Sequence, residues 1–256
     1  MEIQNRKISV NEIDVNYIEV DQGEALVILH GWGANISYWS SVIKNLANDY
    51  KVIALDLPGF GATSTPETIW SSKEYIDFLL NFFEKINLDN FNIIGHSFGG
   101  ALALKLAIEH QEKVKKIILC DPAVIRGERL SLRQKISKFI ADLAPNYLKK
   151  LPFYGFAEKA VYRLAGVSDY YKANPIMREI FKKVISEDMT HLASRLKKPC
   201  LLVWGENDKA TPLSDAFTLK DLIVDSDLKI IKGVGHNPYR KEPEQFIKAV
   251  SDFLKK

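Results

Sequence analysis

The chain has 256 residues, of which 46% are hydrophobic and 26% are charged, a composition typical of a soluble globular protein with one large domain. The formal net charge is only +3 and the basic residues are dispersed, which argues against nucleic acid as a partner. Residues 1–10 lack the features of a signal peptide, and no uncharged apolar run reaches the roughly 20 residues of a membrane span. We therefore expect a cytoplasmic protein.

The beginning of the chain predicts a hairpin. Lys7–Val10 and Asp14–Val20 alternate polar and apolar residues around Asn11 and Glu12, as expected for antiparallel strands at a sheet edge. Later apolar runs predict strands that are buried on both faces. These runs are Ala25–His30, Val52–Leu57, Phe91–Ile94, Val114–Cys120, Cys200–Trp204 and the weaker Leu228–Ile231.

Stretches with helical periodicity follow most of these runs. The clear ones are Ser37–Ala47, Ser72–Ile86, Ala101–His110 and the closing Pro243–Leu254. Alternating strands and helices predict an α/β fold with a mostly parallel central sheet of about eight strands and helices on both faces. Cys120 and Cys200 lie inside apolar runs without metal-ligand spacing, so we interpret both as buried small side chains.

One region interrupts the alternation. Residues 123–198 contain no buried-strand pattern, but they have amphipathic helical stretches and many aromatic side chains. The helical stretches are Leu130–Leu143, Gly155–Leu164 and Pro175–Ser186. We interpret 123–198 as a helical cap inserted between the two parts of the core, 1–122 and 199–256.

The segment Gly95-His96-Ser97-Phe98-Gly99 matches the pattern Gly-x-Ser-x-Gly and lies between a predicted strand and a predicted helix. A strand that turns at once into a helix leaves the serine in a strained backbone conformation. The residues two before and two after the serine then crowd each other, so glycine is needed at 95 and 99. The hydroxyl of Ser97 is predicted to project near a helix N-terminus, which favours developing negative charge.

With this segment in its context, the sequence resembles the α/β-hydrolase family over nearly its whole length. The resemblance implies Ser97 as nucleophile, followed along the chain by an acid and then a histidine base. His236, in Gly233-Val234-Gly235-His236 before the final helix, is at the position of the base. For the acid the resemblance favours Asp208, just after the strand Cys200–Trp204, over Asp121 and Glu206, which remain alternatives.

The resemblance also implies an oxyanion hole made by two backbone N–H groups. One belongs to Phe98, after the nucleophile, and the other to Trp32 in the loop His30-Gly31-Trp32-Gly33. His30 would brace that loop without transferring a proton. The turn Asp56–Gly61 is interpreted as structural, with Phe60 as a possible substrate contact.

These residues predict a serine hydrolase that cleaves small to medium carboxylic esters through an acyl-enzyme, with no metal and no cofactor. Activity should rise through roughly pH 6 to 7.5, because the base must be neutral. The expected substrate is a small molecule with an apolar acyl or aryl group. Trp32, Phe98, Phe139 and Phe153 are the candidate pocket residues.

Other functions fit the same residues. The triad would equally serve a carbon–carbon bond hydrolase, an iminopeptidase, a perhydrolase or an acyltransferase, while a secreted lipase is disfavoured. Serine at position 97 argues against a hydrolase with an aspartate nucleophile. From another class, a receptor that binds a small molecule without turnover could keep the same residues.

Overall fold

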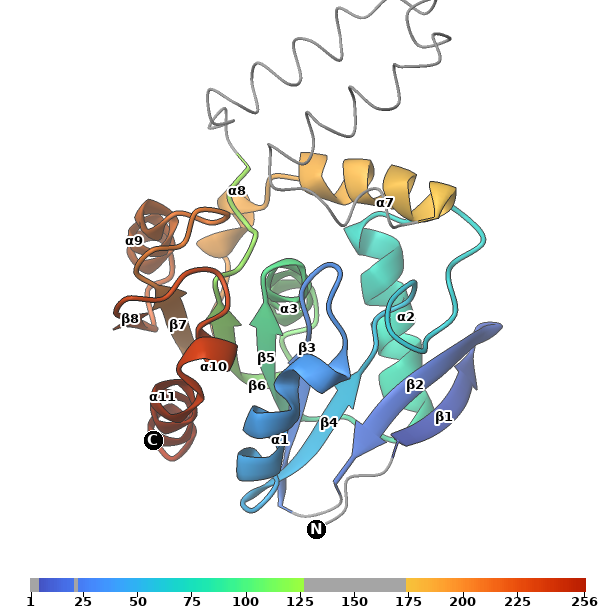
Figure 1. The fold of residues 1–256 in the computed structure, drawn as a ribbon, viewed down its shortest axis with the longest axis horizontal. Helices are drawn as coiled ribbons and strands as arrows, with labels where there is room; N and C mark the ends of the chain where they lie inside the picture. Colours follow the sequence, from blue (N-terminus) through green and yellow to red (C-terminus); the bar gives the residue numbers. More distant parts are fainter. Residues whose placement is uncertain (1–4, 21–22, 127–173) are drawn as a thin grey trace, which may run out of the picture.

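The computed structural model of the chain describes residues 5–20, 23–126 and 174–256. In these residues one sheet of eight strands has the order β1-β2-β4-β3-β5-β6-β7-β8 (Figure 1). The pairs β1–β2 and β2–β4 are antiparallel and all other pairs are parallel. The predicted α/β fold with a mostly parallel sheet is therefore confirmed.

The predicted strands and helices that lie in the described residues are present, with small shifts at their ends. The strands are β1 (Asn5–Val10), β2 (Ile13–Glu19), β3 (Glu24–Leu29), β4 (Tyr50–Leu55), β5 (Phe91–His96), β6 (Val114–Cys120), β7 (Cys200–Gly205) and β8 (Ser226–Ile231). The helices are η1 (Ile36–Trp39), α1 (Ser40–Leu46), α2 (Ser72–Lys85), α3 (Phe98–Glu109), α7 (Pro175–Ser186), α8 (Thr190–Ala193), α9 (Leu213–Leu222), α10 (Pro238–Lys241) and α11 (Pro243–Leu254).

Two of the shifts have clear causes. β4 ends at Leu55, before the predicted Leu57, where its parallel pairing with Leu29 of β3 also ends. Helix α3 begins at Phe98 rather than Ala101, because Ser97 is its N-cap residue. Helices α9 and α10 were not among the predicted elements.

The hairpin β1–β2 closes through Asn11 and Glu12, whose φ angles are 48° and 66°. Two consecutive left-handed residues are typical of the tight turn that matches the twist of an antiparallel pair. The strand β1 lies at the edge of the sheet, as its alternating pattern predicted.

The sheet separates two hydrophobic cores. Side chains alternate along β3, so that Val27 and Leu29 face one core while Leu26 and Ile28 face the other. The first core also receives buried side chains from α2, α3, α7 and α9, and the second receives them from α1, α10 and α11. Both faces of the sheet are therefore covered by helices (Figure 1).

The described parts of the predicted cap are 123–126 and 174–198, and they contain no strand. Helix α7 has the predicted bounds Pro175–Ser186 and lies across the carboxyl edge of the sheet (Figure 1). The predicted helices Leu130–Leu143 and Gly155–Leu164 lie outside the described residues. No helix in the described ranges combines the length and apolar character that crossing a membrane would require.

Candidate active site

The predicted site residues meet at one edge of the sheet. Trp32 follows β3, Ser97 follows β5, Asp208 follows β7 and His236 follows β8. The carboxyl ends of parallel strands lie at a common edge, which is where ligands bind in open α/β sheets. Four loops that are far apart in the sequence thus build one site.

Ser97 occupies a strained turn between β5 and α3. Its φ and ψ angles are 50° and −114°, a conformation that L-amino acids rarely adopt. A Cβ atom at Gly95 would lie 2.7 Å from the Cα of Gly100, so no side chain fits there. The Ser97 N–H donates to the carbonyl of Cys120 on the neighbouring strand β6, which holds the turn in place.

A chain of hydrogen bonds joins the three predicted catalytic side chains. The Oγ of Ser97 lies 3.0 Å from Nε2 of His236, and Nδ1 of His236 lies 2.7 Å from Oδ2 of Asp208. The His236 side chain is 25% exposed, whereas the Asp208 side chain is fully buried. An arrangement of this kind can move a proton from the hydroxyl to the imidazole while the carboxylate orients the ring.

Hydrogen bonds hold Asp208 in its ionised form. Its Oδ1 accepts the N–H groups of Ala210 and Thr211, and its Oδ2 accepts the Thr211 hydroxyl at 2.7 Å. Burial opposes ionisation, but the hydrogen bonds and the nearby His236 outweigh it, so the pKa of Asp208 is lowered. Sequence reasoning missed Thr211, although a hydroxyl residue three positions after a predicted acid is a usable signal.

The two alternative acids have other partners. Glu206 is exposed and accepts the N–H of Gly233, which supports the loop that carries His236. Asp121 is buried and accepts the N–H of Gly205 through Oδ1 at 2.9 Å. The group that accepts the Nδ1–H of His236 is the carboxylate of Asp208, which favours the predicted acid.

His96, next to Ser97, contacts the loop that carries His236. Its Nε2 lies 2.7 Å from the carbonyl oxygen of His236, so this nitrogen carries the proton and donates it. Burial lowers the pKa of His96 to about 3, which keeps the ring neutral. His96 therefore positions the backbone of His236 and is not itself a base.

His30 orients the loop that carries the predicted oxyanion donor. Its Nδ1 donates to the carbonyl of Gly31 at 2.7 Å, and its Nε2 accepts the N–H of Leu57 at 2.9 Å. The Gly31 carbonyl and the Trp32 N–H belong to one planar trans peptide and point in opposite directions. Fixing the carbonyl therefore fixes the direction of the Trp32 N–H. Burial lowers the pKa of His30, so it stays neutral in this role.

The second predicted donor is the N–H of Phe98, in the first turn of α3. Such N–H groups have no partner within their own helix and can bind an anion. In the part of the chain that the structure describes, neither Trp32 nor Phe98 donates its N–H to another group. Among these residues, no acceptor competes with a ligand oxygen for either N–H group.

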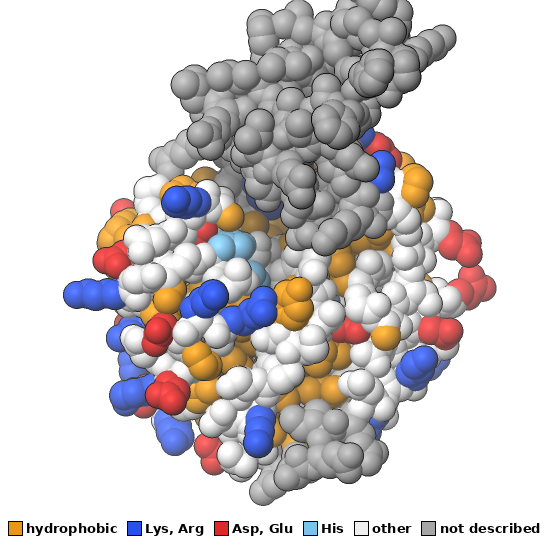
Figure 2. Space-filling view, viewed as in Figure 1, with side chains coloured by type: hydrophobic (Ala, Val, Ile, Leu, Met, Phe, Trp, Pro, Cys, Tyr) orange, Lys and Arg blue, Asp and Glu red, His pale blue; other side chains and the backbone are white. Residues whose placement is uncertain are grey.

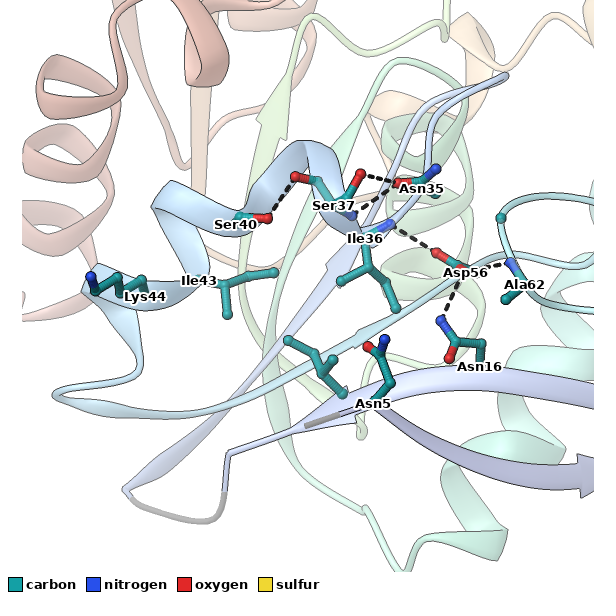
Figure 3. Close-up of a pocket in the computed structure, with 12 residues that line it drawn as sticks. Asn5, Asn16, Asn35, Ile36, Ser37, Ser40, Ile43, Lys44, Asp56 and Ala62 are labelled. Carbon is teal, nitrogen blue, oxygen red and sulfur yellow. Dashed lines mark hydrogen bonds between the residues drawn. The ribbon is translucent and has the colours of Figure 1, made fainter. Parts of the chain in front are cut away.

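The turn that starts at Asp56 is structural, as interpreted from the sequence. Asp56 accepts the N–H groups of Ile36 and Ala62 and the side-chain amide of Asn16 (Figure 3). These bonds tie the loop after β3 to β2. A groove of about 700 Å³ lies against this cluster, between β2 and the helices η1 and α1. Its lining contains none of Ser97, Asp208 and His236.

Aromatic side chains surround the predicted oxyanion loop. The ring of Trp32 lies 4.8 Å from that of Phe60, 5.5 Å from Phe98 and 4.9 Å from Phe181 on α7. Phe181 was not among the predicted pocket residues, while Phe139 and Phe153 lie outside the described residues. Figure 2, in the same view as Figure 1, shows histidine side chains (pale blue) at the surface with hydrophobic side chains (orange) nearby.

Within the described residues, one group of metal-binding residue types occurs near the site. Donor atoms of His96, Asp121 and His236 lie within 4.8 Å of one another. Both ring nitrogens of His236 are already hydrogen-bonded to Ser97 and Asp208, and a metal would have to break one of these bonds. The geometry therefore fits a hydrogen-bonded network better than a set of metal ligands.

Comparisons with known proteins identify the family of the chain. The sequence profile described as alpha/beta hydrolase fold matches residues 24–243. A 2-hydroxy-6-oxo-6-(2'-aminophenyl)hexa-2,4-dienoic acid hydrolase of Metapseudomonas resinovorans is 27% identical, over 97% of this chain and 90% of that protein. A pimeloyl-[acyl-carrier protein] methyl ester esterase of Aeromonas hydrophila is 26% identical, over 91% and 96%. The crystal structure of a serine hydrolase involved in carbazole degradation is 28% identical with a TM-score of 0.76, over 99% of both chains.

Proposed function

The chain belongs to the alpha/beta hydrolase fold family, and from this premise we propose that it is a serine hydrolase with Ser97 as nucleophile, His236 as base and Asp208 as acid. The observation that carries the proposal is the unbroken chain of hydrogen bonds, 3.0 Å and 2.7 Å long, from Ser97 through His236 to Asp208. A serine hydroxyl needs such a base, and the base needs an orienting acid.

In the proposed reaction, Ser97 attacks a carbonyl carbon as His236 takes the hydroxyl proton. The N–H groups of Trp32 and Phe98 bind the oxyanion, which lowers the barrier by several kcal/mol in sites of this kind. His236, now charged beside ionised Asp208, returns the proton to the leaving group. Water then attacks the acyl-enzyme with the same histidine as base.

We propose residues 123–198 as the cap that selects the substrate. The described part of this segment supports the proposal, because α7 brings Phe181 against Trp32, while Met177 occupies the space that a side chain at Gly59 would need. An apolar acyl or aryl group is the substrate that such a lining favours. Small to medium carboxylic esters are the first substrates to test.

A carbon–carbon bond hydrolase is the second candidate. Three of the similar proteins are named as hydrolases of dienoates or of 2-hydroxymuconate semialdehyde, while one is named as a methyl ester esterase. The same nucleophile, base and oxyanion donors can act on a ketone as on an ester. Activity on a ring-cleavage dienoate, compared with an aryl ester, separates the two candidates.

The test combines a fluorophosphonate probe with p-nitrophenyl esters of increasing acyl length. The wild type should be labelled once and should turn over esters, whereas Ser97→Ala should lose the label and about 10⁶-fold in kcat. Ser41→Ala, a change of an exposed serine on α1, is the matched control and should keep both. Full turnover by Ser97→Ala would exclude the proposed nucleophile.

A further inference from the structure

The end of β6 carries a second aspartate that the proposed mechanism does not use. Asp121 follows Cys120 directly, its φ angle of 43° lies in the left-handed region, and its side chain is fully buried. A strained backbone at a buried acidic residue beside an active site needs a physical reason.

The contacts of Asp121 are incomplete if its carboxyl is ionised. Oδ1 accepts the N–H of Gly205 at 2.9 Å, but Oδ2 is buried and finds no donor among the described residues. The carboxylate of Asp208 is close by, because the Thr211 hydroxyl bonds both to the Asp121 carbonyl oxygen, at 3.3 Å, and to Oδ2 of Asp208, at 2.7 Å. Two ionised carboxylates are both acceptors and repel each other, so one proton must lie between them.

The proton belongs on Asp121. Burial, with a smaller contribution from the charge of Asp208, raises the pKa of Asp121 to about 8 despite the hydrogen bond from Gly205. The pKa of Asp208 is lowered instead, because His236 and Thr211 donate to it. At neutral pH the pair therefore carries one negative charge, on the carboxylate that faces His236.

Among the described residues, the other groups around Asp121 supply no permanent positive charge. Burial raises the pKa values of Cys120 and Tyr239, and it lowers that of His96, so all three are neutral at pH 7. One nitrogen of His236 lies within 4.8 Å of an Asp121 oxygen, but the ring nitrogens of His236 bond to Ser97 and Asp208. A proton is thus the simplest partner for Oδ2.

We propose that Asp121 is a positioning residue which, as a neutral carboxylic acid, donates a hydrogen bond to Asp208 and thereby holds that carboxylate against His236. This inference rests on the proposed function, since it assigns a role within the Ser97, His236 and Asp208 chain. The bond to the Gly205 N–H at the end of β7 and the bond to Asp208 just after it together tie the strand ends β6 and β7 at the acid.

Replacing Asp121 in two ways tests the role. Asparagine has the same shape, accepts from Gly205 and donates an N–H to Asp208, so Asp121→Asn should keep kcat within about 3-fold of wild type. Alanine removes both bonds and leaves Asp208 short of a donor, so Asp121→Ala should lower kcat about 10- to 100-fold, with a smaller change in KM. Equal losses in the two variants would overturn the positioning role.

Infrared spectroscopy tests the proton directly and does not require turnover or a folded alanine variant. The wild type should show the C=O stretch of a buried carboxylic acid at pH 7 that disappears as the pH rises past about 8, as expected for the raised pKa of Asp121. Asp121→Asn should lack this band, and Asp208→Asn should lose it at lower pH, because the neighbouring charge is gone. A band that survives in Asp121→Asn, or no band in the wild type, would overturn the proposal.

Ser97→Ala separates failure of this inference from failure of the proposed function. This variant should keep the infrared band although it has no nucleophile. If the band behaves as expected while Ser97→Ala still turns over esters, the proton position stands and the proposed triad falls. If Ser97→Ala is inactive and the band is absent, the triad stands and the role of Asp121 falls.

Discussion

The carboxyl edge of the sheet and helix α7 border the same site but are held in different ways. At the edge, hydrogen bonds with defined partners fix His30, Asp208 and His236. Helix α7 is held mainly by side-chain packing, with Met177, Ile180 and Val184 buried. Its cap residues add hydrogen bonds away from the reacting groups, from the Ser72 N–H to Glu187 and from the Asn174 amide to the Thr65 hydroxyl. Hydrogen bonds require particular atoms, whereas packing tolerates replacement by apolar side chains of similar volume.

We infer from this difference that the two regions have different functions. Groups that must act on a carbonyl with defined geometry belong to the edge, and groups that contact the variable part of a substrate belong to α7. Changes at the edge should therefore alter stability or kcat, whereas changes on α7 should alter KM.

The largest expected effect concerns the buried carboxyl at the edge. The folded protein keeps the Asp121 proton up to about pH 8, while the unfolded chain releases it near the ordinary value of 3.8. At Asp121 the folded state then binds more protons than the unfolded state between these values, so the contribution of this group to stability should fall with rising pH by about 1 kcal/mol per pH unit. Asp121→Asn does not titrate, so its Tm relative to wild type should increase from pH 5 to pH 8 in thermal unfolding. A pH-independent Tm difference would contradict a protonated Asp121.

A smaller effect is expected at His30, where a pair of substitutions separates its two bonds. His30→Asn can still donate to the Gly31 carbonyl, and His30→Gln can still accept from the Leu57 N–H. If the Gly31 bond orients the Trp32 N–H, His30→Gln should lose about 10- to 100-fold in kcat, while His30→Asn should lose much less. Stopped-flow measurement of acylation with a p-nitrophenyl ester gives the comparison. The reverse order would assign the main role to the Leu57 bond.

The smallest effect is expected on α7. Phe181→Ala removes a ring that lies 4.9 Å from Trp32, which should raise KM for aryl and medium-chain esters about 5-fold and leave kcat unchanged. Ile185→Ala, a change of an exposed residue on the same helix, is the control and should change neither constant. A loss of kcat in Phe181→Ala would show that α7 also affects the chemical step. The expected difference between α7 and the sheet edge would then be wrong.

The strands could be predicted from the sequence, and so could the three residues that the hydrogen bonds join, Ser97, His236 and Asp208. Buried parallel strands give uninterrupted apolar runs, and the nucleophile turn requires glycines at fixed distances from Ser97, so both leave local signals. The predicted base and acid, His236 and Asp208, were chosen by resemblance to the family, because each follows a predicted strand where the family has these residues. The fold class and the family are confirmed by the sheet and by the profile match.

Contacts between distant segments left no such signal. Helix α9 was missed because its apolar residues do not follow one face, with Phe217 half exposed while Asp215 is buried. The contact of Phe181 with Trp32 depends on how α7 crosses the sheet edge, which no local pattern encodes. The pKa values of Asp121 and Asp208 differ because Asp208 receives more hydrogen-bond donors. The sequence does not show which carboxyl receives them.

The position of the 123–198 segment also has a consequence for how the chain folds. Cys120 of β6 is opposite Val203 of β7, so these neighbouring strands can pair only after the whole segment between them has been synthesised. Ser97 and His236 are 139 positions apart, so His236 is synthesised long after Ser97. Long-range parallel pairings of this kind slow folding, because loop closure must precede the contacts that stabilise it. A nascent chain therefore carries the strained serine turn without its proposed base until residue 236 has been made.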